Sequence, residues 1–472
     1  MDVLERIEAT PDPGIEPVPP ESRTLSALDV GVLWGDLGIG LLVIVTGALL
    51  APALGFAAAA TAIVLGSLIG VALLALTASA GAAHGVATMV LLRPVLGLRG
   101  SWLPSFLNFV QLIGWCAVEF WAMSYVADLV SDEVFGFSAR PAWLAVVAIV
   151  CVGLALWGPV GVTRVWMERF GAWVVVSICL AITVLLIARG AIGDAIASSG
   201  VGGFPNFGQA LDLVIAMPIS WLPLVADYTR FARRPRGAFF GTFWGYLVAN
   251  IWLYALGVLL ISSAGSAPDP IGVAGGILAV AGGSFAGILF LAGLLAGETD
   301  EAFANIYSGA VSLQNIFPRV SQRALIVGIG LIAAGLAAVL TMTLYESFLF
   351  FLGSVFVPLF GILAADHFVN RRGRVVVDDL YKPGGRYWFS GGVRLRAFVP
   401  WIVGFMVFHW VNPSPLEPWV NLVTSVGGDP LSQRIPWLGG SIPAFAVAFL
   451  LTLVLPRLSS APATTPKTGS AP

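Results

Sequence analysis

The sequence predicts an all-α polytopic membrane protein with about twelve transmembrane helices, and three observations lead to this fold class. Of 472 residues, 58% are hydrophobic and 11% are charged, about half the charged share of a soluble globular protein. Apolar runs long enough to cross a bilayer as helices recur along the whole chain. Basic residues gather in alternate connections between those runs.

Composition also excludes several classes of function. A net charge of −2 provides no basic surface for a nucleic acid, and the apolar content is too high for a soluble enzyme or a disordered scaffold. The three cysteines and three histidines show no metal-ligand spacing. We therefore expect no resident cofactor or structural metal, no nucleic-acid partner, and a lipid bilayer around the chain.

Each apolar run must be helical, because lipid offers no partner to backbone N–H and C=O groups. The predicted spans are 30–53, 57–80, 102–127, 141–161, 170–189, 208–229, 237–262, 283–308, 323–343, 345–367, 397–412 and 437–456. Acidic, Pro-rich residues 1–29 and residues 457–472 are predicted to be disordered tails, and 368–396 to be a loop.

The distribution of basic residues gives the orientation. With a cytoplasmic N-terminus, the connections opposite the cytoplasm carry only Arg140, Arg189 and Arg434. The cytoplasmic connections carry Arg93, Arg99, Arg164, Arg169, Arg230, Arg233, Arg234, Arg236, Arg319, Arg323, Arg371, Arg372, Arg374, Lys382, Arg386, Arg394 and Arg396. This bias predicts an inner (plasma) membrane protein with both termini in the cytoplasm.

The first ten spans divide into two halves of equal length, 30–189 and 208–367. An odd number of spans per half inverts the second half relative to the first, as in secondary transporters. Residues 397–456 would add two helices outside this five-plus-five repeat. Equal spacing by itself is weak support, since any regular series of helices produces it.

Helix-breaking residues occur at corresponding places in the first and sixth spans. The stretch Trp34–Gly40 holds three glycines and an aspartate, and Met217–Pro223 holds two prolines. Paired interruptions of this kind indicate a ligand site between two repeats. Packing kinks are the alternative interpretation.

Polar residues inside two other spans are candidates for that site. Trp115 and Glu119 are four apart and share a helix face, which suits a flat heteroaromatic ring with a polar edge. In the eighth span, Glu298, Glu301 and Asn305 share one face and Asp300 lies on another. Two alternatives stay open. Glu119 can pair with another helix for structural reasons, and the acidic stretch of the eighth span can lie at the membrane surface.

Other polar and aromatic residues favour structural roles. Asp227 and Arg230 are predicted to form an ion pair that anchors or gates the end of the sixth span, and Asp366 is interpreted similarly at the end of the tenth. Phe348, Phe350 and Phe351 are expected to face lipid or pack in the core.

The chain resembles the nucleobase:cation symporter-1 family, the purine–cytosine permease group. The stretches that carry the resemblance are "TGALLAP" (46–52), "SFLNFVQLIGWCAVEF" (105–120), "AMPISWLPLVADYTRF" (216–231), "NIYSGAVSLQNIFPR" (305–319) and "LGSVFVPLFGILAADHF" (352–368). In sequence, these stretches are most similar to the branch of hydroxymethylpyrimidine transporters.

The resemblance implies symport of a nucleobase-like ring with Na⁺ or H⁺ by this inverted-repeat fold. It implies substrate-binding residues at Trp115, Glu119, Trp221 and Asn305. Gly38 and Ser220 of the broken spans and Glu301 of the acidic cluster are further substrate-binding candidates. The resemblance also implies a cation or coupling site at Asp36, Ile39, Ala296, Thr299 and Asp300.

Two residues depart from the family pattern. Glu119 stands where some members have a neutral amide, which favours a ligand with a donor edge, such as an aminopyrimidine. Asp300 stands at a hydroxyl position of the cation site, where a carboxyl group can itself carry a proton.

These features lead to a proton- or sodium-coupled importer of an aminopyrimidine such as cytosine or hydroxymethylpyrimidine. The alternative is a purine, allantoin or hydantoin permease of the same fold. An intramembrane enzyme is disfavoured because HExxH and GxSxG are absent, and an ATP-driven pump because GxxxxGK[ST] is absent. Broken helices argue against a channel. Oligomeric state is left open.

Overall fold

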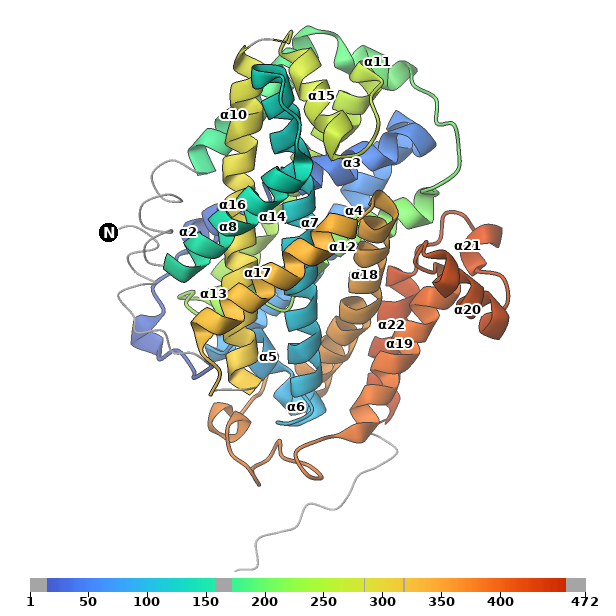
Figure 1. Ribbon diagram of the computed structural model, residues 1–472. Helices are drawn as coiled ribbons and strands as arrows, with labels where there is room; N and C mark the ends of the chain where they lie inside the picture. Colours follow the sequence, from blue (N-terminus) through green and yellow to red (C-terminus); the bar gives the residue numbers. More distant parts are fainter. Residues whose placement is uncertain (1–14, 158–171, 284, 317–318, 456–472) are drawn as a thin grey trace, which may run out of the picture.

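The computed structural model describes residues 15–157, 172–283, 285–316 and 319–455 (Figure 1). These residues form helices and connecting loops. The β-structure among the described residues consists of three isolated β-bridges. The predicted all-α fold class is therefore confirmed. The parts of the predictions that concern 1–14, 158–171 and 456–472, including Arg164 and Arg169, lie outside the described residues.

A helix lies at each of the twelve predicted positions. In chain order the helices are η1 (Pro20–Ser22), α2 (Ala27–Asp36), α3 (Leu41–Leu54), α4 (Phe56–His84), α5 (Thr88–Leu91), α6 (Arg93–Leu96), α7 (Trp102–Phe135), α8 (Arg140–Trp157), α10 (Ala172–Ala188), α11 (Ala191–Ala197), α12 (Phe207–Ser220), α13 (Val225–Thr229), α14 (Pro235–Ala264), α15 (Pro270–Val280), α16 (Phe285–Ile316), α17 (Gln322–Val339), α18 (Met342–Ala364), η3 (Ala365–Asn370), η4 (Val377–Leu380), η5 (Leu395–Ala397), α19 (Phe398–Val411), α20 (Glu417–Gly427), α21 (Leu431–Arg434) and α22 (Ser441–Val454).

Length and composition alone identify fewer spans than twelve. Among the described residues, six helices are long and apolar enough to cross a membrane, or eight if each strongly bent pair is one span. Helices α12, α19 and α22 are shorter apolar helices, and α16 carries three acids in four positions. The protein is a multi-pass membrane protein, and the count of twelve stays a prediction.

The second helix of each predicted half packs on the broken span of the other half. Helix α4 lies along α12 and α13, and α14 lies along α2 and α3. Glycines permit this close approach: a Cβ on Gly70 would overlap Pro218, and one on Gly245 would overlap the carbonyl oxygen of Gly31. The exchanged packing is consistent with the predicted five-plus-five repeat.

Helices α19 and α22 pack against each other and on α18, at one side of the molecule (Figure 1). Asp212, a buried residue of α12, connects them to the broken sixth span. Its carboxylate accepts hydrogen bonds from Asn412 Nδ2 (2.7 Å) and from the backbone N–H groups of Gly440 (2.6 Å) and Ser441 (2.9 Å). Two of these donors belong to the N-terminal turn of α22, where a negative charge is stabilising.

The predicted N-terminal tail needs a correction, because its second half is packed. Val18 and Leu25 are buried, and Ser26 caps α2, which begins at Ala27. Arg23 donates hydrogen bonds to the carbonyl oxygens of Val18, Ala82 and His84. A side chain that satisfies three carbonyls fixes this segment against the end of α4. The composition of residues 1–29 concealed these contacts.

Candidate substrate-binding site

The first broken span supplies one wall of the site. Helices α2 and α3 meet at 63° across a break at residues 37–40. A break exposes the first N–H groups of the following helix, and the N–H of Leu41 donates to Glu298 Oε1 of α16. Glu298 therefore caps the second half of the broken span from a different helix.

The second broken span also lines the site. Helix α12 ends at Ser220 and α13 begins at Val225, which frees carbonyl groups at the end of α12. Gln111 Nε2 of α7 donates a 2.9 Å hydrogen bond to the carbonyl oxygen of Ser220. The next residue, Trp221, packs edge-on against the buried Trp34, with ring centroids 6.1 Å apart. Both broken spans are thus stabilised by side chains of neighbouring helices.

Helices α7 and α16 supply polar groups of the site. They pack along each other, and Asn305 Nδ2 donates a 2.8 Å hydrogen bond to Glu119 Oε1. Glu119 is 1% exposed, and its second oxygen, Oε2, has no hydrogen-bond partner among the described residues. A buried oxygen without a partner is costly, so a ligand donor at this position would be strongly favoured.

These elements line a partly open cavity. Six of the seven residues predicted for the substrate site line it: Trp115, Glu119, Ser220, Trp221, Glu301 and Asn305. The seventh, Gly38, does not line it and packs against Ala249 instead. Gly40 lines the cavity in its place. Glu301 thus lies among the cavity-lining residues of several helices.

The residues predicted for the cation site lie outside the cavity lining. Asp36 ends α2, and the N–H of Ile39 donates to its carbonyl oxygen at 2.9 Å. Thr299 Oγ1 donates to the carbonyl oxygen of Ala296 at 2.6 Å. Asp300 Oδ1 is buried without a hydrogen-bond partner among the described residues, within electrostatic reach of Asp36. Two carboxyl groups from the broken span and α16 thus lie near each other.

Several neighbours of the site were not anticipated. Tyr246 of α14 lines the cavity, yet one tyrosine in an apolar run gives no sequence signal. Phe348, expected to face lipid or pack in the core, packs edge-on against Trp115 at 5.3 Å between centroids. Glu298 belongs to the acidic cluster, but its bond to Leu41 depends on the placement of α3 beside α16.

The end of the sixth span lies apart from this cavity. Asp227 Oδ1 accepts a 3.0 Å hydrogen bond from the N–H of Thr88, and Arg230 Nε donates to the backbone carbonyl of Asp227 at 3.1 Å. These contacts fit the predicted anchoring role. Each of them joins a side chain to a backbone group, whereas the prediction was an ion pair between the two side chains.

Comparisons with known proteins agree with this arrangement. A family model described as "permease for cytosine/purines, uracil, thiamine, allantoin" matches residues 17–427. The hydantoin permease of Microbacterium maritypicum is 25% identical over 76% of this chain and 75% of its own length. A purine–uracil permease of Arabidopsis thaliana is 26% identical over 83% of this chain and 70% of its own length.

A solved structure confirms the fold. Mhp1, a nucleobase–cation–symport-1 family transporter in a closed conformation with bromovinylhydantoin bound, has a TM-score of 0.76 to this chain. The match covers 94% of this chain and 95% of Mhp1 at 21% identity. The relatives are permeases, which agrees with the prediction that the protein is not an enzyme. The chain belongs to the family of permeases for cytosine and purines, uracil, thiamine and allantoin, the nucleobase–cation symporter-1 transporters.

Proposed function

We propose that the protein imports an aminopyrimidine-like ring, such as cytosine or hydroxymethylpyrimidine, by alternating access. The observation that carries this proposal is the unpartnered Oε2 of Glu119, which belongs to a residue lining the cavity. An exocyclic amine can donate to that oxygen, and a charge-assisted hydrogen bond of this kind is stronger than a neutral one. The Asn305 bond fixes the orientation of the carboxyl group.

Two tryptophans support a flat ligand. Trp115 belongs to α7, and Trp221 lies in the break after α12. Both line the cavity. Phe348 packs edge-on against Trp115, and Trp34 packs edge-on against Trp221. We infer that the two indoles hold the ring between them, because aromatic faces stack favourably.

For the coupling ion, we propose a proton carried by Asp300, with sodium as the alternative. The buried Oδ1 without a partner among the described residues and the nearby Asp36 support this proposal, because two neighbouring carboxyl groups that are half-buried favour binding of a cation or proton. Sodium is the alternative because a carboxylate, Thr299 and backbone carbonyls also suit a hard cation.

We place the protein in the inner membrane with both termini in the cytoplasm.

The alternative substrates are a purine, allantoin or a hydantoin. They are favoured by the family description and by the hydantoin permease relative. Uptake of labelled cytosine into vesicles that contain the protein, in competition with unlabelled ligands, distinguishes the two proposals. Competition by aminopyrimidines at the lowest concentration supports the first, and stronger competition by allantoin, hydantoins or purines supports the second.

A further inference from the structure

A second cavity, open to the surface, lies between the start of α19 and the end of α22. Arg394 and Arg396 line it, with Ala397, Pro400 and Thr452 among the other residues. It lies away from the substrate site, at the end of the molecule where the connections rich in arginine are predicted to face the cytoplasm. Neither arginine takes part in the proposed transport chemistry.

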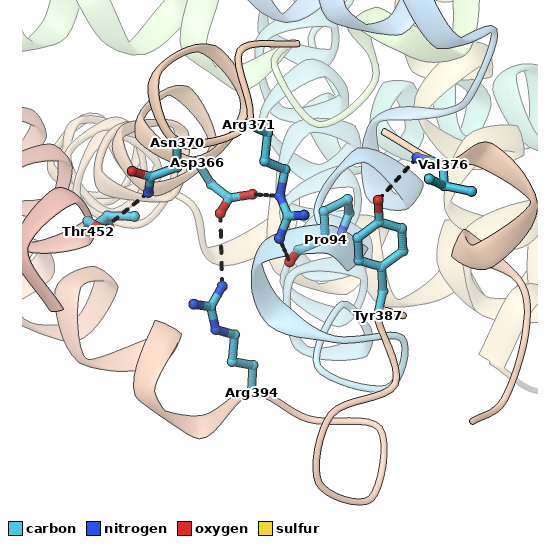
Figure 2. A network of polar contacts seen from close by, with 8 residues as sticks. All are labelled: Pro94, Asp366, Asn370, Arg371, Val376, Tyr387, Arg394 and Thr452. Carbon is cyan, nitrogen blue, oxygen red and sulfur yellow. Dashed lines mark hydrogen bonds and ion pairs between the residues drawn. The ribbon is translucent and has the colours of Figure 1, made fainter. Parts of the chain in front are cut away.

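Positive charge at this cavity exceeds the available negative charge. Asp366 pairs with Arg371 at 2.5 Å, whereas Arg394 approaches it only to 3.9 Å (Figure 2). Arg371 also donates to the carbonyl oxygen of Pro94 at 2.8 Å. Arg396 is exposed and has no ion pair among the described residues. Two guanidinium groups, those of Arg371 and Arg394, thus share the Asp366 carboxylate, and Arg396 adds a third positive charge at the cavity lining.

The surroundings of Arg394 favour an additional anion. Burial lowers the pKa of the Arg394 guanidinium below its ordinary value, and the neighbouring Arg371 lowers it further, while Asp366 acts in the opposite direction. An anion bound between Arg394 and Arg396 would offset both unfavourable effects. Phosphate is one of the two anions, with carboxylate, whose geometry matches the guanidinium fork.

Apolar side chains lead from the cavity along both helices. On the η5–α19 segment the exposed residues Leu395, Val399, Ile402 and Met406 recur at helical spacing, with 49–75% of each side chain exposed. On α22, Leu450 and Val454 are 58% and 54% exposed, four residues apart. Two apolar tracks that begin at a basic cavity match the two acyl chains and the phosphate of a phospholipid.

We propose that this cavity, defined by Arg394, Arg396, Ala397, Pro400 and Thr452, binds the headgroup of an anionic phospholipid whose acyl chains lie along α19 and α22. The apolar tracks commit the site to a lipid rather than to free phosphate. The lipid would join the two peripheral helices at the cytoplasmic surface, where Asn370 Nδ2 already makes a 3.4 Å hydrogen bond to the carbonyl oxygen of Thr452 (Figure 2).

The test is a lipid titration of the purified full-length protein, read by native mass spectrometry and by thermal unfolding. The probes are phosphatidylglycerol, phosphatidylcholine, inorganic phosphate and glycerol 3-phosphate. We expect retention of phosphatidylglycerol and a raised unfolding temperature, with little effect of the other three. Arg396→Gln should weaken phosphatidylglycerol binding about tenfold, because one charge-assisted contact is lost.

Control variants separate this site from general surface charge. Arg374→Gln removes the same charge from an exposed position on the same connection, outside the cavity, and should leave binding unchanged. Arg394→Lys keeps a cation and should weaken binding less than Arg394→Gln. The proposal is overturned if Arg374→Gln and Arg396→Gln have equal effects, or if inorganic phosphate stabilises the protein as well as the lipid does.

Discussion

Asn305 of α16 donates a 2.8 Å hydrogen bond to Oε1 of Glu119 on α7, and this contact leaves Glu119 Oε2 as the free acceptor at the cavity. The two residues lie 186 positions apart in the chain. In the proposed function this pairing determines which edge of a ligand is recognised, because the amide holds one oxygen in place and the other remains available.

Glu119→Gln should weaken binding of aminopyrimidines by about tenfold to a hundredfold, the loss of one charge-assisted hydrogen bond. Binding of oxo-pyrimidines such as uracil should fall less, because the new amide can donate to a ring carbonyl. Calorimetric measurement of cytosine and uracil affinities for the wild type and for Glu119→Gln checks this. Glu133→Gln, at the exposed end of the same helix, is the control. Equal losses for cytosine and uracil would show that Glu119 does not read the amine edge.

Trp115→Ala and Trp221→Ala should each weaken ligand binding roughly tenfold with expression intact, because each removes one stacking face worth on the order of 1 kcal/mol. Trp102 lies on α7 with Trp115 but outside the cavity lining, so Trp102→Ala should have no effect on affinity. Fluorescence or calorimetric titration of the three variants measures this. Unchanged affinity in both cavity variants would refute the assignment of the two indoles to the ligand.

Asp300→Asn should bind substrate yet fail to concentrate it, because the amide cannot take up a proton. The measurement is uptake into vesicles with an imposed pH gradient or an imposed Na⁺ gradient. Wild-type accumulation should follow the pH gradient, and the variant should only equilibrate substrate. Asp132→Asn, exposed at the end of α7, is the control. Accumulation driven only by Na⁺, or concentration of substrate by the variant, would contradict the proton assignment.

Asp212→Ala should lower the thermal stability of the protein, by on the order of 3 kcal/mol in the free energy of unfolding. The change leaves the Asn412 amide and two N–H groups at the start of α22 without their acceptor, and each buried unpaired donor is costly. Asp194→Ala, an exposed acid of α11, should change stability little. Equal unfolding temperatures for the two variants would show that Asp212 does not tie α22 to the sixth span.

Local chemistry explains what could be predicted from the sequence. The break in the first span follows from Gly35, Gly38 and Gly40, which weaken a helix wherever they occur. Trp115 and Glu119 fall on one face because a helix repeats every 3.6 residues. The structure accordingly places six of the seven predicted substrate-site residues around one cavity.

Contacts between distant elements could not be predicted in the same way. Glu298 meets the N–H of Leu41, 257 residues away, only because α16 packs beside the break. The three bonds of Asp212 join positions about 200 or more residues apart, and neither local periodicity nor composition encodes such a register. The packing of Val18 and Leu25 was missed for a related reason, since a Pro-rich, acidic segment is typical of disorder.

The most direct test of the proposed specificity is ligand-induced stabilisation of the purified wild-type protein, because at equal concentrations a ligand that binds the folded state more tightly raises the unfolding temperature more. The panel holds cytosine, hydroxymethylpyrimidine, uracil, adenine, allantoin and a hydantoin, each with and without Na⁺. We expect the largest shift for an aminopyrimidine, with no requirement for Na⁺. A larger shift for allantoin, the hydantoin or adenine than for either aminopyrimidine would contradict the proposed specificity.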